Sequence, residues 1–264
     1  MSPFVLSLLV ALGAGARDVE WISHRGESAD APENTLAAFQ LSWERDVAAI
    51  ELDVHRTADD RLLVCHDADL KRTASEPLAI KSTAADALTK LDVGRWKAAK
   101  FAGEKPPLLD EVLAALPDGR RCYIEMKVGP EAVPALVRCV EQAKLPAARL
   151  PIISFNAATC AEAKRKLPDH SVYLISGFKQ DKPTGAWKPT IDDLIAEAKQ
   201  IHADGLDLAY NGPLDAAGAA KIRAAKLGLY VWTVDKSADA KRMLDLGVDG
   251  ITSNRAAALR DEVK

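Results

Sequence analysis

The chain has 264 residues and a formal net charge of −3, with 48% hydrophobic and 28% charged positions. This balance is typical of a globular protein and excludes a disordered chain, a collagen and a coiled-coil rod. The slight acidic excess gives no sign of the basic face that nucleic-acid binding requires, so we expect no nucleic-acid partner.

The first feature along the chain is an apolar run from Phe4 to Leu12, followed by small residues ending in Ala14-Gly15-Ala16. The run is too short to span a bilayer, which needs about 20 apolar residues. With the small residues behind it, it is typical of a cleaved signal peptide, although no Lys or Arg precedes it. We therefore expect residues 1–16 to direct export, periplasmic or secreted, and residues 17–264 to form the folded domain. A buried first strand or helix is the alternative.

Beyond residue 17, short apolar runs alternate eight times with longer amphipathic stretches. Strand-length runs lie at 19–24, 48–54, 121–127, 151–155, 171–176, 205–210, 229–235 and 249–253, and helix-length stretches at 34–45, 108–116, 131–144, 157–167, 191–202, 215–226, 237–246 and 255–263. Asp215 and Ser237 are candidate helix N-caps, and Gly228 and Gly247 candidate helix stops. Eight strand–helix pairs predict an α/β fold, a (β/α)₈ TIM barrel. An open doubly wound sheet is the alternative that periodicity leaves open.

One connection is much longer than the others: residues 56–107 separate the second predicted strand from its helix. The segment begins as a hairpin, with a turn at Ala58-Asp59-Asp60-Arg61 leading into the run LLVCHD. We expect a small insertion that stands over the carboxyl ends of the strands, because all βα loops of a barrel emerge there. Residues 177–189, after the fifth strand, reach the same face, either as a substrate lip or as a solvated loop.

The chain contains four cysteines, whose spacing matches neither a zinc site nor a C-x-x-C motif. Cys65 and Cys122 lie inside strand-like runs, so we expect them to be buried thiols. The sequence does not predict whether any pair is oxidised.

Carboxylates gather at the ends of two neighbouring strands. Glu51 and Asp53 are two residues apart in AIELDV, so they point to the same face of a strand, the lumen of a barrel. Glu125 and Lys127 repeat this arrangement on the next strand. Three carboxylates in a confined mouth repel one another, and a divalent cation with hard oxygen ligands would relieve the repulsion. Ion pairs with Arg25 and Lys127 are the alternative.

Two of the five histidines fall where strands stop. His24 ends the first strand, and His66 ends the inserted hairpin strand. Imidazole suits both metal ligation and acid/base catalysis. Trp232 also lies at a strand end, where it either lines a substrate pocket or packs in the core.

A set of short motifs follows in a fixed order along the chain. The motifs are His24-Arg25-Gly26, Pro32-Glu33-Asn34-Thr35, Glu51-Leu52-Asp53-Val54, Val64-Cys65-His66-Asp67, Arg72-Thr73, Ile124-Glu125-Met126-Lys127, Val231-Trp232-Thr233-Val234 and Gly247-Val248-Asp249-Gly250-Ile251. Over residues 22 to about 256, this combination resembles the glycerophosphodiester phosphodiesterase family. The family often has Asp at the position of Asn254 and Asn at that of Asp235, and residues 74–105 match loosely. Neither Asn254 nor Asp235 is assigned a role in metal binding or proton transfer.

The resemblance implies a barrel with a small insertion and the hydrolysis of a small-molecule phosphodiester to glycerol 3-phosphate and an alcohol. It implies one divalent cation, Mg²⁺ or Ca²⁺, held by Glu51, Asp53 and Glu125. It further implies that His24 and His66 act as the acid/base pair. The phosphate would be contacted by Arg25 and Lys127.

The nucleophile is either water or the neighbouring hydroxyl of the glycerol, and we favour His24 as the base and His66 as the acid. An exported lysophospholipase D-type enzyme is an alternative function; it needs an apolar access surface. A non-catalytic phosphodiester-binding barrel is another, but it would be expected to lack a histidine or carboxylate. No long basic amphipathic face is present, so we expect no stable membrane insertion. The sequence leaves the oligomeric state open.

Overall fold

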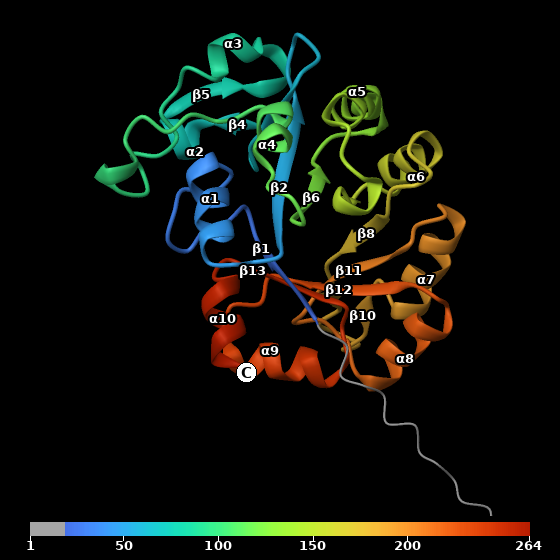
Figure 1. Cartoon of the computed structure of the whole chain (residues 1–264). Coiled ribbons are helices and arrows are strands. Elements are labelled where there is room, and N and C mark those ends of the chain that lie inside the picture. Colours follow the sequence, from blue (N-terminus) through green and yellow to red (C-terminus); the bar gives the residue numbers. More distant parts are fainter. Residues whose placement is uncertain (1–18) are drawn as a thin grey trace, which may run out of the picture.

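A computed structural model describes residues 19–264 (Figure 1). The expected signal peptide, residues 1–16, lies outside the described residues. Within them, eight parallel strands form one closed sheet, because β1 pairs with both β2 and β13. The barrel strands are β1 (Glu20–Ser23), β2 (Ala49–Arg56), β6 (Arg121–Met126), β7 (Ile152–Ser154), β8 (Val172–Ser176), β11 (Gly205–Ala209), β12 (Gly228–Trp232) and β13 (Gly250–Ser253).

Helices cover the outside of the barrel, and apolar side chains fill the space between helices and strands. These helices are α1 (Leu36–Glu44), α4 (Leu109–Ala115), α5 (Val133–Ala143), α6 (Ala157–Lys166), α7 (Ile191–Gln200), α8 (Ala216–Ala224), α9 (Ser237–Asp245) and α10 (Ala256–Glu262). Every predicted strand and helix is present in the predicted order. The TIM-barrel prediction is therefore confirmed, and the open sheet is excluded.

Two of the four predicted helix boundaries differ in detail. Asp215 caps α8 by accepting a hydrogen bond from the backbone of Gly218, and Gly247 ends α9 with a positive φ, as expected. Ser237, however, is the first residue of α9 rather than its cap. Gly228 begins β12, and Lys226 adopts the left-handed conformation instead.

The insertion, residues 57–108, lies at the end of β2 and forms a small lobe beside α1 (Figure 1). Its first strand, β3 (Leu62–Val64), pairs antiparallel with β2 as the predicted hairpin requires. The remaining elements are β4 (Asp69–Leu70), α2 (Lys71–Ala74), β5 (Glu76–Ala79), η1 (Ile80–Ser82), α3 (Ala85–Leu88) and η2 (Ala99–Phe101). The lobe has its own apolar cluster, which includes Leu63, Ile80 and Leu88. This packing holds the loop after β3 in a fixed place over the barrel.

A third apolar cluster fills the inside of the barrel. Tyr123, Tyr173 and Tyr230 stack around the axis with ring centroids 4.6 to 6.2 Å apart. These rings fill the barrel interior below the strand ends.

The connection between β8 and α7, residues 177–190, is the second long one. The loop after β8 carries the hairpin β9 (Lys179–Gln180) and β10 (Trp187–Lys188), and single turns η3 (Pro130–Ala132) and η4 (Ala147–Arg149) flank α5. All four cysteines are free within the described chain, and Cys65 and Cys122 are buried as predicted. Among residues 19–264, no helix has both the length and the apolar character needed to cross a membrane.

The turn after β1 depends on one glycine. Gly26 has a φ of +81°, and a Cβ at this position would lie 2.6 Å from the backbone of Ala38. We expect Gly26→Ala to destabilise the protein by at least about 2 kcal/mol in denaturant unfolding. Gly119→Ala is the matched control, because Gly119 has a φ of +78° but no atom within 4 Å of its Cβ position. If the two variants lost the same free energy of unfolding, the close approach to Ala38 could not be the cause of the destabilisation.

Candidate active site

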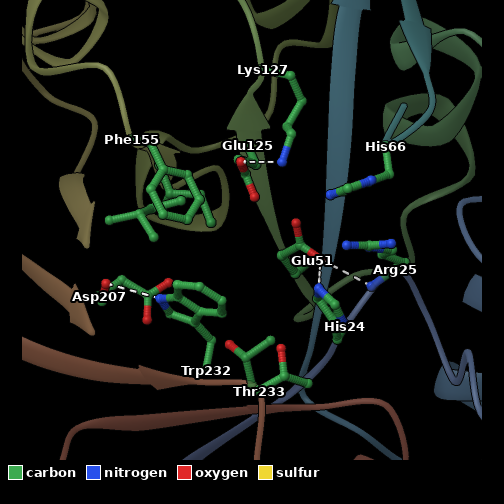
Figure 2. A pocket seen from close by; sticks show the side chains of 13 residues that line it. His24, Arg25, Glu51, His66, Glu125, Lys127, Phe155, Asp207, Trp232 and Thr233 are labelled. Carbon is green, nitrogen blue, oxygen red and sulfur yellow. Dashed lines mark hydrogen bonds and ion pairs between the residues drawn. The ribbon is translucent and has the colours of Figure 1, made fainter. Parts of the chain in front are cut away.

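A cavity of about 330 Å³ opens at the carboxyl ends of the barrel strands (Figure 2). It contains most of the predicted site residues on its walls. His24, Arg25, Glu51, His66, Glu125, Lys127 and Trp232 line it, together with Ile153, Phe155, Ile175, Asp207, Thr233 and Thr252. Asp53, the remaining predicted residue, lies fully buried behind this wall.

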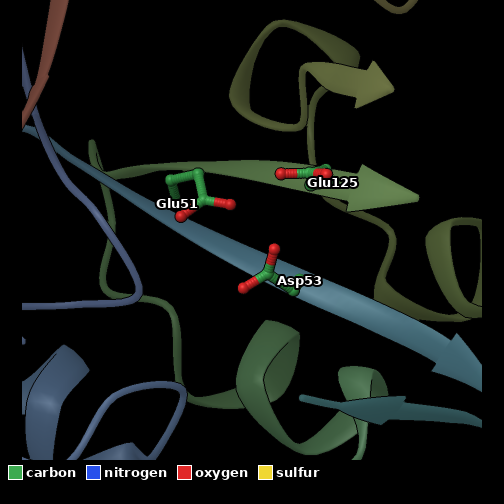
Figure 3. Close-up of side chains that lie close together, drawn as sticks. All are labelled: Glu51, Asp53 and Glu125. Atoms are coloured by element: carbon green, nitrogen blue, oxygen red, sulfur yellow. The ribbon is translucent and has the colours of Figure 1, made fainter. Parts of the chain in front are cut away.

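Three carboxylates form the centre of one wall (Figure 3). Glu51 and Asp53 point to the same side of β2, and Asp53 lies opposite Glu125 in the register of β2 with β6. One oxygen from each residue lies within 4.8 Å of the others, and all three side chains are buried. We call Glu51, Asp53 and Glu125 the carboxylate trio.

Burial and mutual repulsion perturb the trio strongly. The pKa of Glu51 is raised well above its ordinary value by burial and then by Asp53 and Glu125. The pKa of Glu125 is raised to about 7 by burial and then by Asp53. Burial also acts to raise the pKa of Asp53, but Arg25 and Lys127 outweigh it, and that pKa is lowered. The raised pKa values of Glu51 and Glu125 mean that the described residues supply too little positive charge to keep all three carboxylates ionised.

Two cations partly compensate this charge. Arg25 Nε lies 3.1 Å from Asp53 Oδ2, and the Arg25 backbone N–H donates to Glu51 at 2.9 Å. Lys127 Nζ lies 2.7 Å from Glu125 Oε1 and 3.5 Å from Asp53 Oδ1. The ion pairs weighed as an alternative to a metal site are present. Among residues 19–264, Glu51 Oε1 is nevertheless buried without a hydrogen-bond partner.

Asn34, for which the sequence predicts no role, lies in the motif Pro32-Glu33-Asn34-Thr35 and contacts Asp53. Asn34 Nδ2 donates to Asp53 Oδ2 at 2.8 Å, and Asn34 Oδ1 accepts the backbone N–H of Asp53 at 3.2 Å. Its neighbour Glu33 accepts hydrogen bonds from both Arg25 and Arg72. The loop before α1 therefore fixes one carboxylate and one cation of the site.

His24 lies on the same wall, at the end of β1. Its Nδ1 lies 2.7 Å from Asn254 Oδ1, while Asn254 Nδ2 donates to Asp235 at 2.6 Å. Because the amide of Asn254 directs its oxygen toward the ring, the ring proton belongs on Nδ1 and the lone pair on Nε2. Burial, followed by Arg25, lowers the pKa of His24 to about 4. The ring is therefore neutral near pH 7, and Asn254, to which the sequence analysis gave no role in proton transfer, orients it.

The insertion supplies the second histidine. His66 lies two residues beyond β3, and its Nδ1 is 2.7 Å from Asp67 Oδ1. Arg72 holds the other oxygen of Asp67 at 2.7 Å. Figure 2 shows the ring of His66 above Arg25, directed into the cavity. Both predicted histidines therefore reach the same space from different elements.

The opposite wall is aromatic and apolar. Trp232 meets Phe155 edge to face with centroids 5.4 Å apart, and its Nε1–H donates to the backbone oxygen of Asp207 at 3.2 Å. Trp232 both lines the cavity and packs against the apolar cluster inside the barrel, so the two predicted placements occur together. Asp207 itself was missed by the sequence analysis, because a single acid in the run GLDLAY carries no motif.

The wall with the carboxylate trio offers oxygen ligands suited to a hard divalent cation, beside two cationic side chains and two imidazoles. Such a set can bind a phosphate group and move protons on either side of it. Fold and site together define a (β/α)₈-barrel enzyme whose chemistry lies at the carboxyl ends of its strands.

Comparisons with known proteins agree with this class. A profile described as the Glycerophosphoryl diester phosphodiesterase family matches residues 24–258. The glycerophosphodiester phosphodiesterase of Caldanaerobacter subterraneus subsp. tengcongensis is 32% identical over 248 residues, covering 92% of this chain and 97% of that protein. A Bacillus subtilis protein of the same name is 28% identical over 250 residues, covering 88% and 82%.

The fold is also found among solved structures. An Oleispira antarctica phosphodiesterase, solved with the product sn-glycerol-3-phosphate, has a TM-score of 0.82 at 24% identity and covers 92% of this chain and 96% of its own. The chain belongs to the glycerophosphoryl diester phosphodiesterase family. The predicted family is confirmed, and with it the enzyme class, a phosphoric diester hydrolase.

We expect Glu125→Gln to stabilise the metal-free protein above neutral pH. The folded pKa of Glu125, about 7, lies above its ordinary value of 4.5, so wild-type stability falls as the pH rises between these values. The variant lacks this loss, and Lys127 keeps Asp53 as a partner. Thermal unfolding in chelator at about pH 8 should show a gain of roughly 1–3 kcal/mol, with a smaller gain at about pH 4.5.

Glu141→Gln is the control for this experiment, because Glu141 is exposed on α5 and the same change there should have little effect. A gain in Glu125→Gln that does not depend on pH would contradict the electrostatic explanation.

Proposed function

We propose that the protein hydrolyses glycerophosphodiesters to glycerol 3-phosphate and an alcohol, using one divalent cation and two histidines. The observation that carries this proposal is the convergence of the carboxylate trio, Arg25, Lys127, His24 and His66 on one cavity. The 32% identical relative that is named a glycerophosphodiester phosphodiesterase supports it.

The carboxylate trio fits a cation. Its oxygens are hard ligands, they lie within 4.8 Å of one another, and Glu51 Oε1 has no partner in the described protein. Glu51, Asp53 and Glu125 would hold Mg²⁺ or Ca²⁺, both of which prefer oxygen ligands. When bound, the cation supplies positive charge that neutralises the phosphate and favours ionisation of the attacking hydroxyl.

Arg25 and Lys127 bind the phosphate beside this centre. Both line the cavity, and both are held in place by the carboxylates of the trio. Arg25 is further fixed by Glu33, so its guanidinium presents a preset edge to the anion. The two side chains therefore orient the diester as well as attract it.

His24 is the base in this scheme. With its proton on Nδ1 and its pKa near 4, the ring is neutral and its Nε2 lone pair is free near pH 7. Nε2 takes the proton from the nucleophile, which is either water or the adjacent hydroxyl of the glycerol. Asp235 and Asn254 keep the ring in this tautomer.

His66 is the acid. Its Nδ1–H points to Asp67, so Nε2 is the atom that faces the substrate. A proton on Nε2 passes to the oxygen of the leaving alcohol as the P–O bond breaks. The partly exposed position of His66 on the insertion suits a group that meets the alcohol near the cavity entrance.

Replacing either histidine tests this assignment. We expect His24→Ala and His66→Ala each to lower turnover by roughly 10²–10⁴ while thermal unfolding stays close to wild type. His202→Asn is the control, because His202 is exposed, and Asn tolerates its positive φ. Near-normal turnover in either alanine variant would disprove the two-histidine scheme.

A substrate panel tests the function and the cation together. Glycerophosphocholine, glycerophosphoethanolamine and glycerophosphoinositol should each release glycerol 3-phosphate with Mg²⁺ or Ca²⁺, and chelator should abolish the reaction. Cation at about 100 times its Kd should also stabilise the fold by roughly 2–3 kcal/mol, and Glu51→Gln should lose this gain.

Each outcome of the panel has a distinct meaning. Full activity in chelator would exclude the cation from the reaction. Faster hydrolysis of lysophosphatidylcholine than of glycerophosphocholine would favour the lysophospholipase D alternative. Binding of diesters without turnover would favour the phosphodiester-binding barrel.

A further inference from the structure

The cavity has a closed floor and an open rim. On the floor, Ile153, Ile175, Thr252 and Asp207 are each no more than 5% exposed. At the rim, Phe155 is 50% exposed, and the side chain of His66 is 34% exposed. A diester whose phosphate lies at the carboxylate trio therefore has one ester group on the floor and the other at the rim.

Asp207 is the acid of the floor, on the side of the cavity opposite Arg25 and His66 (Figure 2). It is 5% exposed, and its Oδ1 is buried without a hydrogen-bond partner in the described protein. Burial of an unpaired carboxyl group destabilises a fold. The proposed mechanism does not use this group, so its presence on the floor points to a ligand.

We propose that Asp207 binds a hydroxyl group of the substrate's glycerol, so that glycerol lies on the floor and the leaving alcohol lies at the rim beside His66. This inference rests on the proposed function and extends it to the orientation of the substrate. It makes Asp207 a specificity-determining residue for small polyol esters.

The surroundings of Asp207 suit glycerol. Ile153 and Ile175 offer apolar surface to a short carbon chain, while Asp207 offers the hydrogen bond that a hydroxyl group needs. Burial, followed by Glu125, raises the pKa of Asp207 to about 8, so the neutral carboxyl can both donate and accept.

The orientation also agrees with the two histidines. His24 is 17% exposed and lies on the wall of the carboxylate trio, whereas His66, which is 34% exposed, meets the alcohol at the rim.

The test compares the affinities of two anions that share the phosphate but differ in the glycerol. Calorimetry on the cation-loaded enzyme measures the Kd of sn-glycerol 3-phosphate and of inorganic phosphate. We expect wild type to bind glycerol 3-phosphate more tightly. Asp207→Ala should weaken that binding about tenfold or more and leave phosphate binding within about twofold. Asp207→Asn should keep most of the difference, because an amide also donates and accepts.

Asp192→Ala, the same change on the exposed face of α7, should leave both affinities unchanged. The ratio of the two Kd values separates a specific effect from partial unfolding, because partial unfolding would weaken the binding of both anions to the same extent. Equal binding of the two anions by wild type, or an unchanged ratio in Asp207→Ala, would overturn the inference.

A second measurement separates the two ends of the substrate. In Asp207→Ala, kcat/KM should fall to the same extent for glycerophosphocholine and glycerophosphoinositol. A fall confined to the choline ester would show that Asp207 binds the head group instead, and would overturn the inference. If wild type hydrolyses no glycerophosphodiester, the proposed function fails. Hydrolysis with an unchanged affinity ratio disproves only the orientation.

Discussion

The crowding of three carboxylates at the end of two adjacent strands is the constraint on which the site depends. Strand pairing fixes Asp53 opposite Glu125, and the pleat brings Glu51 to the same side, so the groups cannot separate. Arg25 and Lys127 bring positive charge that reduces this repulsion. The repulsion that they do not compensate raises the pKa of Glu51, which favours its protonated form. A wall with this unbalanced charge could hold a divalent cation.

Much of this arrangement follows from short-range patterns. Each barrel strand is an apolar run that is followed in the sequence by an amphipathic helix. The eight strand–helix pairs could therefore be predicted from the sequence alone. The two-residue spacing of Glu51 and Asp53 fixes their common direction, and chain order places Glu125 on the next strand. The insertion was visible as an overlong connection, and its hairpin as a turn between two apolar runs. The helix boundaries at Ser237 and Gly228 were wrong, because neighbouring residues took over the cap and the left-handed turn.

The residues that sequence reasoning missed are those placed by closure of the barrel. Asn254 reaches His24 across 230 positions because β1 pairs with β13, with Ser23 opposite Ser253. No local pattern encodes that contact. Asp207 had a weak signal, a single acid in an otherwise apolar strand at a position that faces the lumen. Its lack of a partner becomes visible only when the neighbouring strands are in place.

The two walls of the cavity come from different parts of the chain. The charged wall comes from β1, β2, β6 and the insertion, whereas the apolar wall comes from β7, β8, β11 and β12. The first wall is tied together by ion pairs and amide hydrogen bonds, so a substitution there disturbs several partners at once. On the second wall, the buried Oδ1 of Asp207 has no hydrogen-bond partner among the described residues, so a substitution there breaks no hydrogen bond to that atom. Under the proposed function, substrate preference can therefore vary at β11 while the groups proposed to react stay fixed.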